Sequence, residues 1–203
     1  MTWTAFPRPY LSLGHPLPVL LLFCLFTAPT VLPASTQQPP EPELRKFLID
    51  AISTAGSFED QFAAEVWLVD MSTRLQNKVP DPAERIQILK AVHIEATRAH
   101  LPPELVLALI EVESNFDRFA ISVAGARGLM QVMPFWLDEI GRPDDDLFHI
   151  RTNLRFGCTI LRYYLDKEGG SQTRALARYN GSVGKVWYPR RVFSALHKRW
   201  YRQ

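Results

Sequence analysis

Two glutamates, Glu111 and Glu113, close an apolar segment and are the first candidates for chemistry in this chain. The segment predicts a buried helix over residues 104–113. At about 100° per residue the two side chains point roughly 200° apart, so we expect one to face water and the other the interior or a cleft. A carboxyl group against apolar walls has a raised pKa, as a general acid near neutral pH requires. This pattern alone is weak evidence, because a glutamate at a helix end is more often merely exposed.

Four short motifs begin at Glu113 and follow one another along the chain. Residues 113–116 read Glu-Ser-Asn-Phe, residues 128–134 read Gly-Leu-Met-Gln-Val-Met-Pro, residues 153–157 read Asn-Leu-Arg-Phe-Gly, and residues 179–182 read Tyr-Asn-Gly-Ser. In this order and spacing they resemble the motifs of the soluble lytic transglycosylase family. The catalytic domain of that family has a lysozyme-like fold and cleaves peptidoglycan.

The resemblance implies roles for residues of the first and last motifs. It places the acid and base carboxyl group at Glu113, with Ser114 beside it supporting its position and contributing to substrate binding. It implies that Tyr179 hydrogen-bonds the Glu113 carboxyl group, and that Asn180 orients this tyrosine or contacts substrate. The alternative for Tyr179 is a core tyrosine with its hydroxyl satisfied elsewhere.

The loop between these motifs supplies the remaining expected contacts with sugar. By the same resemblance, Met130 and Gln131 line the sugar cleft, and Ser122 lies on a loop that contacts an N-acetyl group. Leu129 and Met133 are expected in the core instead, and a core position is the alternative for Met130.

The distribution of carboxylates bears on the reaction. Most glycoside hydrolases need two carboxyl groups, but no Asp or Glu lies between Asp117 and Asp138, and we interpret Asp117 as a surface residue. A site with one usable carboxyl group must rely on the substrate. Glu113 would then protonate the leaving oxygen and later take the proton of the sugar's own C6 hydroxyl, leaving a 1,6-anhydromuramic end. This chemistry requires no metal or organic cofactor.

The elements that must position these residues are helical. We expect an all-α, lysozyme-like fold, one globular domain with at most a small β excursion around residues 117–130. Asp81 and Pro82 have the types preferred at a helix start. Three buried stripes are expected at helical spacing: Phe62, Val66, Val69 and Leu75; Ile86, Leu89, Val92 and Ala96; Leu154, Cys158, Leu161 and Leu165.

The chain divides into four expected parts. Residues 1–34 have Arg8 near the start, an apolar run over 19–28 and the small residue Ala34 at the exit, as in a secretory signal peptide. The run is about ten residues, whereas roughly twenty are needed to span a bilayer. A Pro-rich tether (35–42), an N-terminal helical segment (43–92) and the catalytic domain (93–203) follow. We therefore expect a periplasmic protein, with an uncleaved membrane anchor as the alternative.

Charge and cysteine content limit the partners. A formal net charge of +2 is too balanced to favour nucleic acid, and two cysteines without a Cys/His cluster suggest neither a disulfide scaffold nor a metal site. The stretch from residue 169 onward is basic without Asp or Glu. It either docks on an anionic polymer or is a solvated face that balances the acidic residues 144–146. We expect a monomer that binds peptidoglycan glycan strands, and an envelope protein partner stays open.

Two other functions compete with this interpretation. A hydrolytic muramidase on the same fold would need a second carboxylate or an ordered water. A non-catalytic peptidoglycan-binding or scaffold module of an envelope assembly would not need Glu113. The sequence predicts that Glu113→Gln abolishes turnover and that Glu111→Gln is nearly silent.

Overall fold

The computed structural model describes residues 61–201. The expected signal peptide, the tether and residues 43–60 of the N-terminal helical segment lie outside this range. Within it, α-helices and one short π-helical turn follow one another: α2 (Gln61–Leu75), α3 (Pro82–Arg98), α4 (Pro103–Glu113), α5 (Phe135–Ile140), α6 (Ile150–Lys167), α7 (Gln172–Tyr179), α8 (Trp187–Ala195) and η1 (Leu196–Trp200). A search of these residues finds no helix long and apolar enough to span a bilayer.

The all-α class is confirmed. The β excursion expected around residues 117–130 consists of two isolated bridges in the described range, which join Ile121 to Arg127 and Arg127 to Val132. These bridges fold the chain between α4 and α5 back on itself, beside the C-terminal end of α4. The excursion is therefore a short folded loop rather than a sheet.

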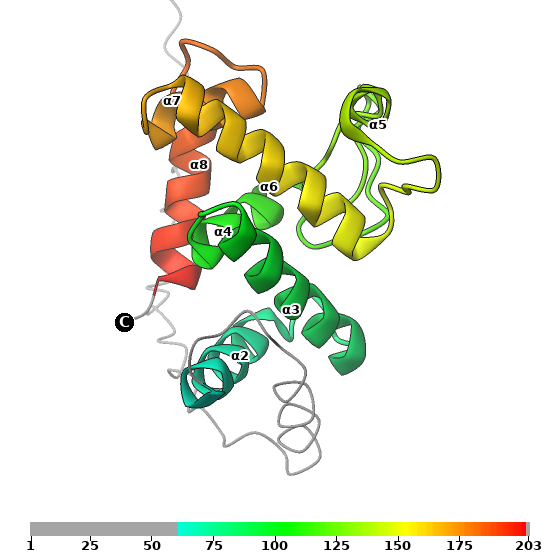
Figure 1. The fold of residues 1–203 in the computed structure, drawn as a ribbon. Coiled ribbons are helices and arrows are strands. Elements are labelled where there is room, and N and C mark those ends of the chain that lie inside the picture. The colour runs from blue at the N-terminus through cyan, green and yellow to red at the C-terminus, as the bar shows by residue number, and fades with distance from the viewer. Residues whose placement is uncertain (1–60, 202–203) are drawn as a thin grey trace, which may run out of the picture. The chain divides into compact units, whose positions relative to one another are not determined.

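Helix α4 lies at the centre of the described structure, with α3 on one side and α8 and η1 on another (Figure 1). Six consecutive residues, from Leu105 to Ile110, are buried, so the helix is enclosed on all faces for more than a turn. This confirms the buried helix expected from the sequence. Because the surrounding elements fix α4, its C-terminal residue Glu113 has a fixed place in the molecule.

Helix α3 begins as its sequence predicts. The Asp81 carboxylate accepts a hydrogen bond from the Ala83 amide at 3.0 Å, and Pro82 occupies the first turn. Its expected inward stripe is buried: Ile86, Leu89, Val92 and Ala96. The helix continues without a break through residue 93, so the expected N-terminal segment and the expected catalytic domain share one helix and one core.

The stripe predicted for α2 was wrong for Phe62 and Val66, whereas Leu75 is buried and Val69 packs partly buried against the core. Phe62 and Val66 are 72% and 41% exposed. The apolar residues of this helix lie on several faces, so their spacing alone does not select one, and the contacts with α3 and η1 decide it. The residues that become buried are Ala64, Trp67, Leu68, Met71, Ser72 and Leu75.

The expected stripe of α6 is confirmed, since Leu154, Cys158, Leu161 and Leu165 are all buried. Cys158 is a free thiol whose pKa burial raises, which makes it unreactive as a nucleophile. The structural interpretation of this cysteine holds. The same helix places Asn153 and Gly157 against the loop that follows α4.

Candidate active site

Glu113 ends α4, and its carboxyl group is in contact with α8. The Tyr188 hydroxyl, near the start of α8, donates a hydrogen bond to Glu113 Oε1. Burial raises the pKa of Glu113 to about 7, although the Tyr188 hydrogen bond and the positive charge of Arg191 both act to lower it. Near neutral pH a large share of the molecules therefore carries a protonated Glu113, the form that can act as an acid.

Glu111 lies two residues earlier in a different environment. Its side chain is only 7% exposed and forms ion pairs with Lys78 at 3.2 Å and Arg199 at 2.6 Å. The Trp200 indole also donates to its carboxylate at 2.8 Å. The expectation that one of the two glutamates faces water was wrong, because η1 and the turn after α2 supply partners that cover Glu111. It ties α4 to the C-terminal turn.

Ser114 connects the end of α4 to the following loop. Its hydroxyl donates to the Leu129 carbonyl at 2.8 Å and accepts from the Phe116 amide at 3.2 Å. Asn115 and Phe116 both have left-handed backbone angles, with φ of 51° and 70°, which turn the chain sharply after the helix. Ser114 therefore supports the position of Glu113 through the backbone turn and not through a bond to its carboxyl group.

A buried asparagine on α6 organises residues 127–130. Asn153 accepts from the Met130 amide at 2.8 Å and donates to the Arg127 carbonyl at 2.8 Å. Gly128 has a φ of +72°, and a Cβ there would lie 2.4 Å from Asn153 Nδ2. The glycine of this motif is required for the close approach of loop and helix.

The expected sugar contact of Met130 was wrong. Its side chain is completely buried against α6, where a Cβ on Gly157 would come within 2.3 Å of its sulfur. Met133, which was expected in the core, is partly exposed and lines a surface pocket. The two methionines are three residues apart and lie in different environments, one against α6 and one at the pocket.

The tyrosine that contacts Glu113 is not the expected one. Tyr179 donates instead to the Met130 carbonyl at 2.7 Å and so holds the loop onto α7. Sequence reasoning missed Tyr188, which is 2% exposed. The only signal for it was an aromatic pair, Trp187 and Tyr188, at the start of the last helix, and nothing in that pattern shows that α8 packs against the end of α4.

A pocket of about 260 Å³ brings together three of the expected site residues, Gln131, Tyr179 and Asn180, with Met133 and Trp136 in its wall. Glu113 is not in its lining, but the negative charge of Glu113 contributes, after burial, to raising the pKa of Tyr179. Tyr179 is therefore the lining residue that interacts electrostatically with Glu113. The pocket is a candidate groove for a sugar chain.

Ser122 lies in the loop between α4 and α5, where its side chain stabilises the turn over residues 122–126. Its hydroxyl accepts from the Ala126 amide at 3.0 Å, and its side chain is partly exposed. Gln131 has a similar local function, since its amide donates to the carbonyls of Ala120 and Gly128 at 3.1 and 3.0 Å. Ser122 is not part of the pocket lining, so the structure brings together Gln131, Tyr179 and Asn180 but not Ser122.

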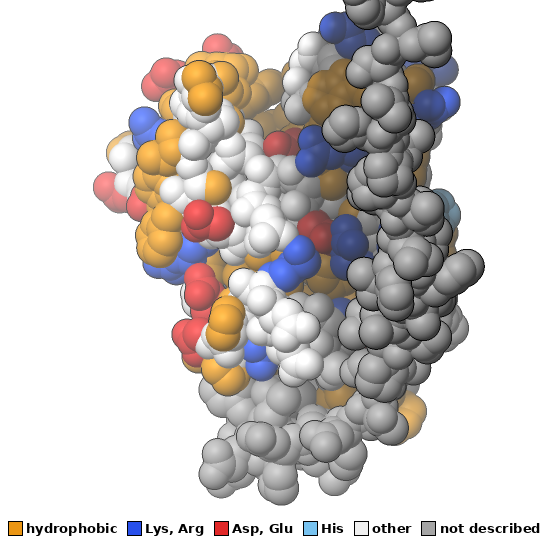
Figure 2. All heavy atoms as spheres, turned by 180° about the vertical axis from the view of Figure 1, so that it is seen from behind, with side chains coloured by type: hydrophobic (Ala, Val, Ile, Leu, Met, Phe, Trp, Pro, Cys, Tyr) orange, Lys and Arg blue, Asp and Glu red, His pale blue; other side chains and the backbone are white. Residues whose placement is uncertain are grey.

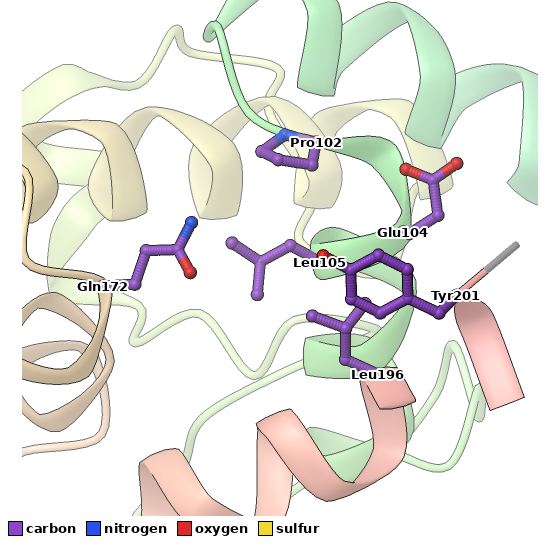
Figure 3. Close-up of a pocket in the computed structure, with 6 residues that line it drawn as sticks. All are labelled: Pro102, Glu104, Leu105, Gln172, Leu196 and Tyr201. Atoms are coloured by element: carbon purple, nitrogen blue, oxygen red, sulfur yellow. The ribbon is translucent and has the colours of Figure 1, made fainter. Parts of the chain in front are cut away.

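A separate hollow of about 290 Å³ lies at the other end of α4 (Figure 3). Leu105, Leu196 and the ring of Tyr201 form its apolar wall, with the Gln172 amide across from them. The carboxylate at its edge, Glu104, accepts from the Trp67 indole at 2.9 Å. On α4, Leu105 precedes Glu113 by roughly two helical turns, or about 12 Å along the axis. We do not assign this hollow to the same chemistry.

Three arginines of the basic C-terminal stretch pair with carboxylates other than those of residues 144–146. Arg174 and Arg178 pair with Glu168, and Arg199 pairs with Glu111. The acidic run is bound locally, for example by an ion pair between Asp145 and Arg155 at 2.6 Å. On the face in Figure 2, basic, acidic and hydrophobic side chains of the described residues lie interspersed. No group of three or more potential metal ligands occurs in the described range.

The comparisons with known proteins agree with the motifs. The Transglycosylase SLT domain family matches residues 90–199. A transglycosylase of Enterobacteria phage PRD1 is 27% identical over 118 residues, which are 55% of this chain and 44% of that protein. The membrane-bound lytic murein transglycosylase C of Actinobacillus pleuropneumoniae (serotype 5b, strain L20) is 48% identical over 48 residues, which are 24% of this chain and 13% of that protein.

A search of solved structures finds an inactive variant of the lytic transglycosylase Slt from Pseudomonas aeruginosa, with a TM-score of 0.44 and 20% identity over 73% of this chain and 31% of that one. The chain thus spans less than half the length of each of these relatives. The family match covers more than half of the 203 residues. On that basis the chain belongs to the Transglycosylase SLT domain family.

Proposed function

We propose that the chain is a peptidoglycan lytic transglycosylase that cleaves the β-1,4 bond between N-acetylmuramic acid and N-acetylglucosamine. The observation that carries the proposal is the state of Glu113, a shielded carboxyl group with a pKa raised to about 7 and a fixed hydrogen bond from Tyr188. An acid of this kind donates a proton near neutral pH, which an exposed glutamate does not. The family match and the relatives named lytic transglycosylases support the same reaction.

The reaction uses one carboxyl group twice. Protonated Glu113 gives its proton to the glycosidic oxygen as the bond from that oxygen to C1 of the muramic acid breaks. The substrate's N-acetyl group stabilises the positive charge that develops at C1. The C6 hydroxyl of the same sugar then bonds to C1 and releases its proton to the Glu113 carboxylate. Glu113 returns to its starting state, a 1,6-anhydro ring forms, and no water is consumed.

The other site residues position rather than react. Tyr188 holds the Glu113 carboxyl group in one orientation, and Tyr179 fixes the loop through the Met130 carbonyl. Gln131, Asn180 and the partly exposed Met133 face the pocket, where we expect the sugars to bind. A tethered hydroxyl needs no encounter with a second molecule, which is a large entropic advantage over water.

The surroundings of Glu113 favour this reaction over hydrolysis. A hydrolytic muramidase needs a second carboxylate, and the candidate, Asp117, is exposed and bound to the Phe119 amide at 2.9 Å. The groups that shift the pKa of Glu113 are Tyr188 and Arg191, neither of which is a carboxylate. A scaffold module would gain nothing from a buried acid that costs stability at neutral pH.

The same proposal places the protein in the cell envelope. Its substrate lies outside the cytoplasmic membrane, and one relative is named as membrane-bound. The basic start, short apolar run and small-residue exit of residues 1–34 favour export by a signal peptide into the periplasm.

Mass spectrometry of fragments released from purified sacculi tests the reaction. We expect the wild-type chain to release muropeptides with 1,6-anhydromuramic ends and Glu113→Gln to release none. Fragments with reducing ends, each heavier by one water, would show a hydrolase instead. Binding to sacculi without release by either protein would support the scaffold module.

A further inference from the structure

A second pocket, of about 390 Å³, lies on the side of α7 away from Tyr179. Three of its lining residues are basic, namely Arg174, Arg178 and Lys185, and one is acidic, Glu168. The formal charge of these four side chains is therefore +2. The proposed acid-base reaction at Glu113 uses none of them.

This basic pocket adjoins the proposed sugar pocket. Arg178 lines both, and the residues of the two pockets alternate along one segment of chain. Ala177 belongs to the basic pocket, residues 179–181 belong to the sugar pocket, and residues 183–186 belong to the basic pocket again. The C-terminal end of α7 and the loop after it thus separate two hollows that one branched ligand can occupy together.

The arginines of the basic pocket are already arranged around a carboxylate. Glu168, with a side chain only 12% exposed, accepts from Arg174 Nε at 2.7 Å and from Arg178 Nε. Within the described residues, Arg178 has no protein acceptor for its two terminal nitrogens, and Lys185 forms no ion pair. Glu168 therefore orients the two guanidinium groups and leaves donors free for a second carboxylate.

Apart from Thr173, the rest of the pocket wall carries no polar side chain. Val183 and Val186 are 60% and 48% exposed, and Ala177 lies opposite on α7. Carboxylates alternating with short apolar side chains are the chemistry of the peptide that muramic acid carries on its lactyl group. We propose that this pocket binds that stem peptide while the glycan occupies the pocket beside Tyr179. The inference rests on the proposed function, because it takes peptidoglycan as the substrate.

The test compares Lys185→Gln with Lys198→Gln, an exposed lysine on η1 outside both pockets. Each protein is assayed on glycan strands with peptides, on strands stripped of peptide, and on strands whose peptide carboxylates are amidated. Loss of one exposed charge contact is expected to raise KM on peptide-bearing strands about three- to fivefold with kcat unchanged. On stripped and amidated strands, Lys185→Gln should match wild type, and Lys198→Gln should match it on all three substrates.

The double variant Lys185→Gln/Arg174→Gln is expected to raise that KM about tenfold or more. Equal losses on peptide-bearing and stripped strands, or no loss on either, would overturn the proposed peptide site. If wild type releases anhydro ends from stripped strands but shows no preference among the three substrates, only the peptide site fails. If it cleaves no strand, the proposed reaction fails, and the peptide site is then judged by whether Lys185→Gln weakens binding to peptide-bearing strands alone.

Discussion

The two glutamates that end α4 have the same side chain and opposite environments. Glu111 is enclosed by cations, since Lys78 and Arg199 pair with it and the Trp200 indole donates to it. Glu113 forms no ion pair within the described residues and accepts a hydrogen bond from the Tyr188 hydroxyl, and burial is the largest cause of its raised pKa. Shielding from water is common to both. The presence of cations determines whether the buried carboxyl group stabilises the fold or stays protonated for chemistry.

This contrast also explains why the basic C-terminal stretch is not uniform in function. Arg199 on η1 neutralises a structural carboxylate, whereas Arg191 on α8 lies close enough to Glu113 to lower its pKa without forming an ion pair with it. A full ion pair at Glu113 would hold it ionised and remove the acid.

The largest expected effect is on the rate of Glu113→Gln. An amide of the same shape accepts the Tyr188 hydrogen bond but donates no acidic proton, so we expect turnover to fall by about 10³-fold or more. Release of muropeptides from sacculi measures the rate, and thermal unfolding checks that the variant is folded. A folded Glu113→Gln with near-normal turnover would remove this glutamate from the reaction.

The next effect is on the pH dependence of stability. The pKa of Glu113 is raised from 4.5 to about 7, so between these values the folded state holds a proton that the unfolded state releases. Stability from this group is therefore lost as pH rises, by about 2 to 3 kcal/mol between pH 5 and pH 8. Urea unfolding of wild type and Glu113→Gln at both pH values measures it. From pH 5 to pH 8 the free energy of unfolding of Glu113→Gln should rise relative to that of wild type by about 2 to 3 kcal/mol. A difference between the two proteins that is the same at both pH values would contradict the raised pKa.

Glu111→Gln tests the role of the ion-paired glutamate. It leaves Lys78 and Arg199 without their carboxylate, and because both cations are partly exposed we expect a loss of about 1 to 2 kcal/mol in the free energy of unfolding. At a temperature where the variant is folded, turnover should stay near that of wild type, and a large loss of turnover would mean that Glu111 takes part in the reaction.

The smallest effect is expected from Tyr188→Phe. One hydrogen bond to the carboxyl group is lost, which is worth about 1 kcal/mol, so the rate should fall about five- to tenfold. Because that bond lowers the pKa of Glu113, its removal should move the upper limb of the pH-rate profile to higher pH. Tyr179→Phe is the matched control, since its hydroxyl bonds the Met130 carbonyl. A shift in the control and none in Tyr188→Phe would reverse the assignment of the two tyrosines.

Much of the fold was predictable from local signals. Asp81 caps α3 as its type and position suggest, and the stripe around Cys158 is buried because α6 has apolar residues on one side. Helix α2 has apolar residues on several faces, so Phe62 was wrongly expected inside. Where local pattern does not select a face, packing against distant elements decides it.

The candidate site shows the same difference between local sequence signals and contacts with distant elements. The motifs identified Glu113 as the candidate acid, because a motif is a short continuous segment that can be recognised without knowing the fold. The partner of that acid was not local: Tyr188 is 75 residues away in sequence and reaches it only because α8 packs on α4. The resemblance placed Met130 in the cleft, and this was wrong because the close approach of Gly157, on a distant helix, buries its side chain.

The most direct test of the central claim is a carbon-13 NMR titration of the Glu113 carboxyl group, assigned by comparison with Glu113→Gln. We predict that this carbon titrates with a midpoint near pH 7, the value that burial gives it. A midpoint near 4.5, the ordinary value, would mean that water or a cation reaches the group in solution and that Glu113 is not a protonated acid at neutral pH.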